Sequence, residues 1–185
     1  MLESYEAQRA NSREPLTATR SLYNSAVTGQ QGKIIFTGSA VAEVASTKHL
    51  DPACPLKALN DEKAFVSADR YNESKLVLHS LVRPLIAHLP NIIITDVNPG
   101  FVYTPLYSGG GSAAIAAKRI GRKPEEGARN VSFALITLEQ STDWYTDCKP
   151  CRLHAPWLHS REGVTFSETL WAELLEVVVG FSPDL

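Results

Sequence analysis

The sequence has no long apolar run and almost no net charge. No stretch approaches the ~18 consecutive apolar residues that a membrane-spanning helix needs, and the net charge is −2. A charge so close to zero gives no reason to expect nucleic acid or an anionic lipid surface as a partner. The sequence therefore favours neither a membrane nor a nucleic acid among its partners.

Cysteine is also scarce, with three residues in a chain of 185. A small, odd number favours reduced thiols in an intracellular compartment over a framework of disulfides. Residues 1–6 are too polar and too acidic for a signal or transit peptide. Together these features predict a cytoplasmic protein.

A third absence concerns the arrangement of the glycines. None of the 11 glycines falls into a Gly-x-x-x-Gly-x-Gly segment after an N-terminal strand, the turn that holds a dinucleotide pyrophosphate at the start of a helix. Residues 109–111 are three successive glycines, but they follow a loop and are not closed by Lys and Ser or Thr. We interpret them as part of a substrate loop.

The residues that are present predict alternating strands and helices. Apolar and charged fractions of 44% and 21% are ordinary for a globular protein, and no linker divides the chain, so we expect one domain over residues 1–185. The predicted elements are a helix over 15–27, a strand over 33–37, an inserted loop with one helical turn over 40–67, a helix from Ser67 or Asp69 to Leu89 with a kink at Pro84, a strand over 92–97, a Gly- and Ala-rich loop over 105–122, a helix over 124–138, a short strand near Trp144 and a final helix over 162–179.

This alternation predicts a parallel sheet with crossover helices, in which ligands bind beyond the carboxyl ends of the strands. Ser39 and the loop over 98–104 each follow directly after a predicted strand. We therefore expect them at one rim of the sheet.

The segment 71–75, Tyr-Asn-Glu-Ser-Lys, carries the most informative chemistry. Residues four apart lie on one face of a helix, so Tyr71 and Lys75 can point into the same site. A tyrosine hydroxyl is a poor base at neutral pH, but a nearby ammonium stabilises its phenolate form. A serine hydroxyl at a neighbouring strand end, Ser39, can then orient a substrate oxygen.

The chain holds a second Tyr-x-x-x-Lys segment, at Tyr145 and Lys149, which shows how weak the pattern is alone. Pro150 follows this second copy, and neither an apolar helix after it nor a serine-ended strand before it accompanies it. The context therefore favours Tyr71 and Lys75.

From Gln31 to about Gly180 the sequence resembles the short-chain dehydrogenase/reductase family, and within it the retinol-dehydrogenase-like reductases of filamentous fungi. Ser39, the segment 71–75 and Asn98-Pro99-Gly100 carry this resemblance, together with the wide gap between residues 39 and 71 and the segment 55–62. It implies a doubly wound, Rossmann-like α/β sheet of which this chain is the C-terminal catalytic half, with residues 1–30 poorly matched.

The resemblance also implies roles for individual residues. Tyr71 would donate or accept the proton, and Lys75 would stabilise its phenolate and contact the nicotinamide ribose. Ser39 would orient the substrate, although Thr37-Gly38-Ser39 departs from the commoner double serine. Val102 and Thr104 match positions at the nicotinamide end of the cofactor. Asn11 is the candidate for the fourth catalytic residue of the family.

Cys148, Cys151, His154 and His159 form a rival pattern, since four possible zinc ligands lie within twelve residues. Their spacing matches no common zinc finger, and prolines interrupt the stretch. We therefore expect no metal site.

The resemblance thus implies a truncated oxidoreductase that uses NADP or NAD to interconvert a carbonyl and an alcohol, in a fungal secondary-metabolite pathway. The alternative is an inactive remnant that acts as an interaction partner, because the pyrophosphate turn is absent. Beyond the small-molecule substrate, we expect a second copy of the chain or a partner chain to cover the strand edge left open by the truncation.

Overall fold

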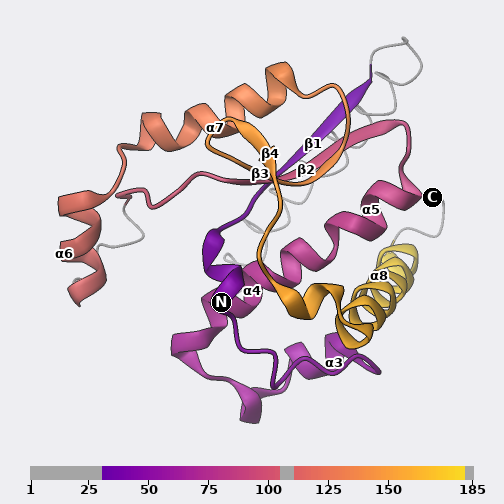
Figure 1. Cartoon of the computed structure of the whole chain (residues 1–185). Helices are drawn as coiled ribbons and strands as arrows, with labels where there is room; N and C mark the ends of the chain where they lie inside the picture. The colour runs from indigo at the N-terminus through magenta and orange to yellow at the C-terminus, as the bar shows by residue number, and fades with distance from the viewer. Residues whose placement is uncertain (1–30, 105–110, 182–185) are drawn as a thin grey trace, which may run out of the picture.

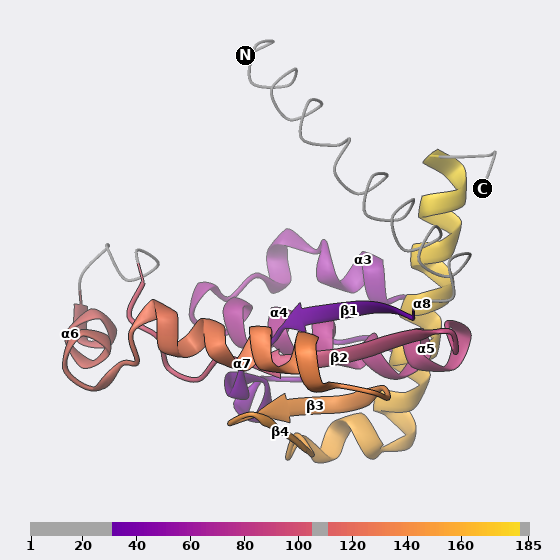
Figure 2. The same ribbon diagram turned by 90° about the horizontal axis from the view of Figure 1, so that it is seen from above.

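The structure, a computed structural model, describes residues 31–104 and 111–181. Its centre is one four-stranded sheet with the order β1-β2-β3-β4 (Figures 1 and 2). The strands are β1 (Gly32–Thr37), β2 (Ile92–Asn98), β3 (Thr142–Thr146) and β4 (Lys149–Cys151). The predicted helix over 15–27 and the candidate residue Asn11 lie outside the described residues.

The first three strands are parallel, and β4 turns back antiparallel to β3. The predicted strands over 33–37 and 92–97 are confirmed, and β1 pairs with β2 in register from Gly32 opposite Ile92 to Thr37 opposite Val97. Short, continuous apolar runs suit strands that are covered on both faces. The architecture is α/β and Rossmann-like, as the sequence predicts.

Helices cover the two faces of the sheet. In chain order the helices of the described residues are η1 (Ala40–Val44), α3 (Pro55–Leu59), η2 (Glu62–Ala64), α4 (Ser67–Ser80), α5 (Val82–His88), α6 (Gly111–Ile120), α7 (Pro124–Thr137), η4 (Pro156–His159) and α8 (Arg161–Phe181). Figure 1 shows α7 on one side of the sheet and α4, α5 and α8 on the other.

Two apolar clusters fill the space between the sheet and these layers. Trp144 packs with Leu76 of α4 and Phe166 of α8, whereas its neighbour Tyr145 packs with Ala134 of α7 on the opposite face. The helices between β1 and β2 and the helix between β2 and β3 therefore lie on opposite faces. Because both connections step the same way across the sheet, they have opposite handedness, an exception to the strong preference for right-handed crossovers.

The long helix predicted to end at Leu89 is divided into α4 and α5 at Leu81. Pro84 has no backbone N–H, and its ring would collide with the carbonyl of Ser80, four residues earlier. The bond from the Leu81 N–H to the Leu78 carbonyl tightens the turn there. The break therefore falls where the proline predicts a kink, but the expected side-chain cap is wrong: Val66 occupies that position and makes no capping bond.

Two predicted loops contain more helix than expected. Residues 40–67 hold η1, α3 and η2, and residues 111–120 form α6. The segment after Gly111 is rich in alanine and ends in Lys118 and Arg119, all good helix formers, so the prediction gave its glycines too much weight. The predicted helices at 124–138 and 162–179 are confirmed as α7 and α8.

β1 lies at one edge of the sheet that the described residues form. Most of its side chains are partly exposed, unlike those of β2, where five successive residues are buried. Among the described helices, none combines the length and the apolar character needed to cross a membrane.

Candidate active site

A hollow at the carboxyl ends of β1 and β2 gathers the residues that the sequence singles out. It has a volume of about 410 Å³, within the range of small-molecule sites. The end of β1 contributes Ser39, α4 contributes Tyr71 and Lys75, and the loop after β2 contributes Val102 and Thr104. The structure thus brings together every described residue predicted for the site.

Tyr71 and Lys75 lie one helical turn apart on α4, and both line the hollow. The Tyr71 side chain is exposed, and the Lys75 Nζ lies 5.7 Å from the centroid of its ring. Lys75 Nζ also donates a hydrogen bond of 2.8 Å to the carbonyl of Thr37 at the end of β1. This bond holds the ammonium beside the tyrosine and joins α4 to the strand that carries Ser39.

Ser39 caps η1, the short helix that follows β1. Its Oγ accepts a hydrogen bond from the N–H of Val41 at 3.5 Å, a long contact for such a bond. Because Oγ is the acceptor in this contact, the hydroxyl proton stays available to a substrate oxygen in the hollow.

Beneath Ser39 lies a buried acid–histidine pair that the sequence analysis missed. Asp96 of β2 is fully buried, and its Oδ2 lies 3.0 Å from Nδ1 of His79 on α4. The His79 ring in turn meets Trp144 edge-on, with 5.4 Å between the centroids. The other carboxylate oxygen, Oδ1, has no hydrogen-bond partner among the described residues. A charged residue within the apolar run 92–97 was the signal that could have revealed this pair.

The Asp96 carboxylate explains the unusual glycine at position 38. A Cβ atom built on Gly38 would lie 2.2 Å from Asp96 Oδ1 and 2.5 Å from Oδ2, much closer than van der Waals contact. A second serine before Ser39 would therefore collide with the buried carboxylate. The departure from the double serine follows from the residue on the neighbouring strand.

The loop after β2 is fixed by Asn98, the last residue of that strand. Its Oδ1 accepts a hydrogen bond of 3.0 Å from the Gly100 N–H, and its Nδ2 donates one of 3.2 Å to Oγ1 of Thr146. Asn130 of α7 donates to the Asn98 carbonyl at 3.2 Å. Gly100 has a φ of 82°, a conformation that favours glycine. These bonds set the path of the chain towards Val102 and Thr104.

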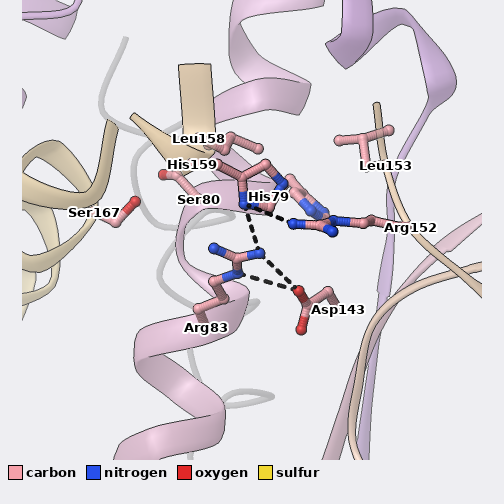
Figure 3. Close-up of a pocket in the computed structure, with 9 residues that line it drawn as sticks. All are labelled: His79, Ser80, Arg83, Asp143, Arg152, Leu153, Leu158, His159 and Ser167. Carbon is pink, nitrogen blue, oxygen red and sulfur yellow. Dashed lines mark hydrogen bonds and ion pairs between the residues drawn. The ribbon is translucent and has the colours of Figure 1, made fainter. Parts of the chain in front are cut away.

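A second, small cavity holds a polar cluster rather than a ligand site (Figure 3). Arg83 donates from Nε to Asp143 at 3.1 Å and from Nη2 to Nδ1 of His159 at 3.0 Å, and Arg152 approaches the same histidine nitrogen at 3.4 Å. The loss of solvent, and after it the charges of Arg83 and Arg152, lower the pKa of His159. With a volume of about 10 Å³, the cavity has room for about one water molecule.

The four residues of the rival zinc pattern do not form a ligand set. Cys148 and Cys151 are free and exposed, and the Cys148 Sγ donates to Oδ1 of Asn130 at 3.3 Å. His159 meets the two arginines. Across residues 31–104 and 111–181, no group of three or more His, Cys, Asp or Glu side chains is placed to hold a metal ion.

Comparison with known proteins gives three curated relatives. The chain is 32% identical over 130 residues to the short chain dehydrogenase sor7 of Hypocrea jecorina, a match that covers 64% of this chain and 36% of that protein. It is 27% identical over 173 residues to a short chain dehydrogenase of Arthrobotrys oligospora, covering 86% and 52% of the two chains. The short-chain dehydrogenase anuD of Penicillium roqueforti is 26% identical over 167 residues, covering 78% of this chain and 44% of the relative.

These matches support placing the chain in the short-chain dehydrogenase/reductase family. The chain spans about half, or less, of the length of these relatives. No family model and no solved structure matches it.

Proposed function

We propose that this chain carries the catalytic side of an NAD(P)-dependent oxidoreductase that interconverts a carbonyl and an alcohol. One observation carries the proposal: Tyr71, Lys75 and Ser39 line a single hollow at the carboxyl ends of the parallel strands. The curated relatives support an oxidoreductase role at the level of the family.

The described residues fit one end of a nicotinamide dinucleotide. Lys75 presents an ammonium at the hollow, where it can donate to a ribose hydroxyl, and Val102 and Thr104 line the same hollow from the loop after β2. The sequence offers no Gly-x-x-x-Gly-x-Gly turn for the pyrophosphate. The chain therefore holds the nicotinamide end, and the rest of the cofactor needs groups from elsewhere.

Within this proposal the side chains divide the proton chemistry between them. The bound cofactor supplies or takes up the hydride. Tyr71 gives a proton to the developing alkoxide, or removes one from the alcohol in the reverse direction, while the Lys75 ammonium stabilises the phenolate that results. Ser39 donates a hydrogen bond to the substrate oxygen and so orients it towards Tyr71.

The finer assignments rest on the resemblance to the retinol-dehydrogenase-like reductases of filamentous fungi. It supports NADP as the cofactor and a role in fungal secondary metabolism, whereas the proposed cytoplasmic location rests on the scarcity of cysteine and the polar first residues. The position of Ser39 and the wide interval before Tyr71, which the structure fills with η1, α3 and η2, agree with that subgroup.

An inactive remnant is the second candidate, and it is favoured by the position of β1 at the edge of the sheet that the described residues form. An edge strand with partly exposed apolar side chains is a template for pairing with another chain. In this reading the chain self-associates, or pairs with a partner chain along β1. Analytical ultracentrifugation of the 185-residue chain tests the association: a clean monomer at micromolar concentration would contradict it.

Two measurements separate the candidates. We expect calorimetric titration to show weak binding of NADPH or none to the isolated chain, since the pyrophosphate lacks its backbone donors. We then expect NADPH oxidation with an aromatic aldehyde or a quinone once a second chain is added that carries the Gly-x-x-x-Gly-x-Gly segment of the family. If that mixture binds NADPH yet gives no turnover that depends on Tyr71, the oxidoreductase proposal is wrong.

A further inference from the structure

The loop that carries Val102 and Thr104 is held from outside by a single arginine. Arg122 lies between the end of α6 and the start of α7. Its N–H donates to the carbonyl of Phe101 at 2.7 Å, and its carbonyl accepts from the N–H of Tyr103 at 3.0 Å. These bonds form a short parallel bridge between Val102 and Arg122. The backbone of Arg122 thus sets the register of the loop.

The side chain of Arg122 reaches the turn at the start of the same loop. Its Nη1 donates to the carbonyl of Pro99 at 3.2 Å. The guanidinium also lies against Gly100, where an added Cβ would come within 2.5 Å of Nη1. A side chain at position 100 is therefore excluded both by the positive φ and by the guanidinium.

The other end of the guanidinium is anchored in the turn between β3 and β4. Nη2 of Arg122 donates to Oδ1 of Asp147 at 2.7 Å. Asp147 and Cys148 have φ angles of 49° and 58°, costly values for residues other than glycine. The Cys148 N–H donates to Oδ1 of Asn130 at 2.9 Å, and Asn130 also donates to the Asn98 carbonyl.

These contacts close a ring around the loop: Arg122 holds Pro99, Asp147 holds Arg122, and Asn130 joins the turn of Asp147 back to Asn98. We propose that Arg122 is a positioning residue of the active site, with Asp147 as its anchor. Its guanidinium keeps the Pro99–Gly100 turn, and with it Val102 and Thr104, at the rim where the nicotinamide end binds. This role rests on the proposed function, whereas the restraint on the loop does not.

A fork of two donors suits this task better than a point charge. One guanidinium can bond Pro99 and Asp147 at the same time in fixed directions, which an ammonium on a flexible stem does not do. As an exposed surface ion pair alone, the contact with Asp147 would contribute little. Its effect is therefore expected on the loop rather than on the overall stability.

The test compares Arg122→Met, Arg122→Lys and Asp147→Asn with Arg119→Met, which changes an exposed arginine on α6. Hydrogen exchange of the 185-residue chain is followed at the backbone amides of residues 100–104. In Arg122→Met we expect exchange there to be about three- to tenfold faster, as loss of a restraining hydrogen bond predicts. Asp147→Asn should show a smaller change in the same residues, Arg122→Lys partial recovery, and Arg119→Met none.

Kinetics measured after addition of a chain that carries the Gly-x-x-x-Gly-x-Gly segment of the family separates this inference from the proposed function. Arg122→Met should raise the KM for NADPH about tenfold and leave kcat nearly unchanged, because the chemistry belongs to Tyr71. Exchange at residues 100–104 that is unchanged in both Arg122 variants would overturn the inference, whatever the activity. If exchange is faster in the variants but the unmodified protein shows no turnover, the restraint on the loop stands and the oxidoreductase proposal is wrong. If Arg122→Met fails to fold, Arg122→Lys and Asp147→Asn decide the question.

Discussion

The chain contains two copies of the same spacing, Tyr71 with Lys75 and Tyr145 with Lys149, and the fold treats them in opposite ways. On α4 the four-residue interval brings both side chains to one hollow, with Tyr71 46% exposed. In the second copy Tyr145 lies in β3, 2% exposed beneath α7, and Lys149 lies across the turn in β4, opposite Thr146.

The difference shows that the spacing gains its meaning from the secondary structure beneath it. A helix repeats its face every three or four residues, whereas a strand alternates its faces and a hairpin reverses direction. The first tyrosine therefore reaches the hollow of the proposed site, and the second packs in the core. Substitutions that affect only one of these properties can test this division.

The largest effect is expected from truncation of the packing tyrosine. Tyr145→Ala should lower the free energy of unfolding by about 3–5 kcal/mol, as for other large buried side chains, because it opens a cavity between β3 and α7. Tyr71→Ala, on an exposed side chain, should cost much less. Chemical denaturation with urea measures both. Equal losses of stability would contradict the division of roles.

Next comes the loss of the reactive hydroxyl. Tyr71→Phe should lower kcat on the order of 10²-fold or more, because the group that transfers the proton is gone, with little change in the unfolding midpoint. Tyr145→Phe is the matched control and should retain its rate. The measurement is the rate of NADPH oxidation in the mixture of the 185-residue chain with a chain that carries the Gly-x-x-x-Gly-x-Gly segment. Loss of activity in Tyr145→Phe with normal activity in Tyr71→Phe would show that the wrong pair was chosen.

A smaller effect is expected from changes at Gly38, which lines the same hollow as Tyr71 and Lys75, and at Asp96 next to it. Gly38→Ser should cost about 1–3 kcal/mol through overpacking against Asp96. Asp96→Ala should cost a similar amount by leaving His79 without its partner, yet the double variant should be more stable than the sum of the two losses predicts. Gly180→Ser, at a site with no atom within 4 Å of an added Cβ, is the control. If the stability losses of the two single variants simply add, the collision between Ser at position 38 and the Asp96 carboxylate is relieved by other means.

The smallest effect concerns the polar cluster beside β3. The pKa of His159 is lowered in the folded chain, so the unfolded chain binds the proton more readily, and stability falls as the pH drops through about 6.5. His159→Gln should remove this part of the acid sensitivity. Because His159 is exposed, we expect the fall in melting temperature between pH 7.5 and 5.5 to shrink by only on the order of 1 °C. A larger fall in the melting temperature of His159→Gln than of the unmodified chain would contradict this prediction.

The sequence revealed the parts of the site that follow from local pattern. Apolar runs predicted β1 and β2, and helical spacing predicted that Tyr71 and Lys75 share a face. It could not reveal contacts that depend on tertiary packing. Glu73 is 2% exposed on α4, although its neighbours give no sign of a buried acid. The bond between His79 and Asp96 joins a helix to the following strand, and Arg122 reaches Pro99 from 23 residues away.

The close approach of Gly38 and Asp96 has a consequence for how this site can change through mutation. A side chain at position 38 collides with the carboxylate of Asp96, and removal of that carboxylate leaves Nδ1 of His79 without its partner. Each single step away from the present arrangement therefore begins with a loss of stability. Position 38 at a strand end, His79 on a helix and Asp96 on a second strand therefore change at the least cost in stability when they change together.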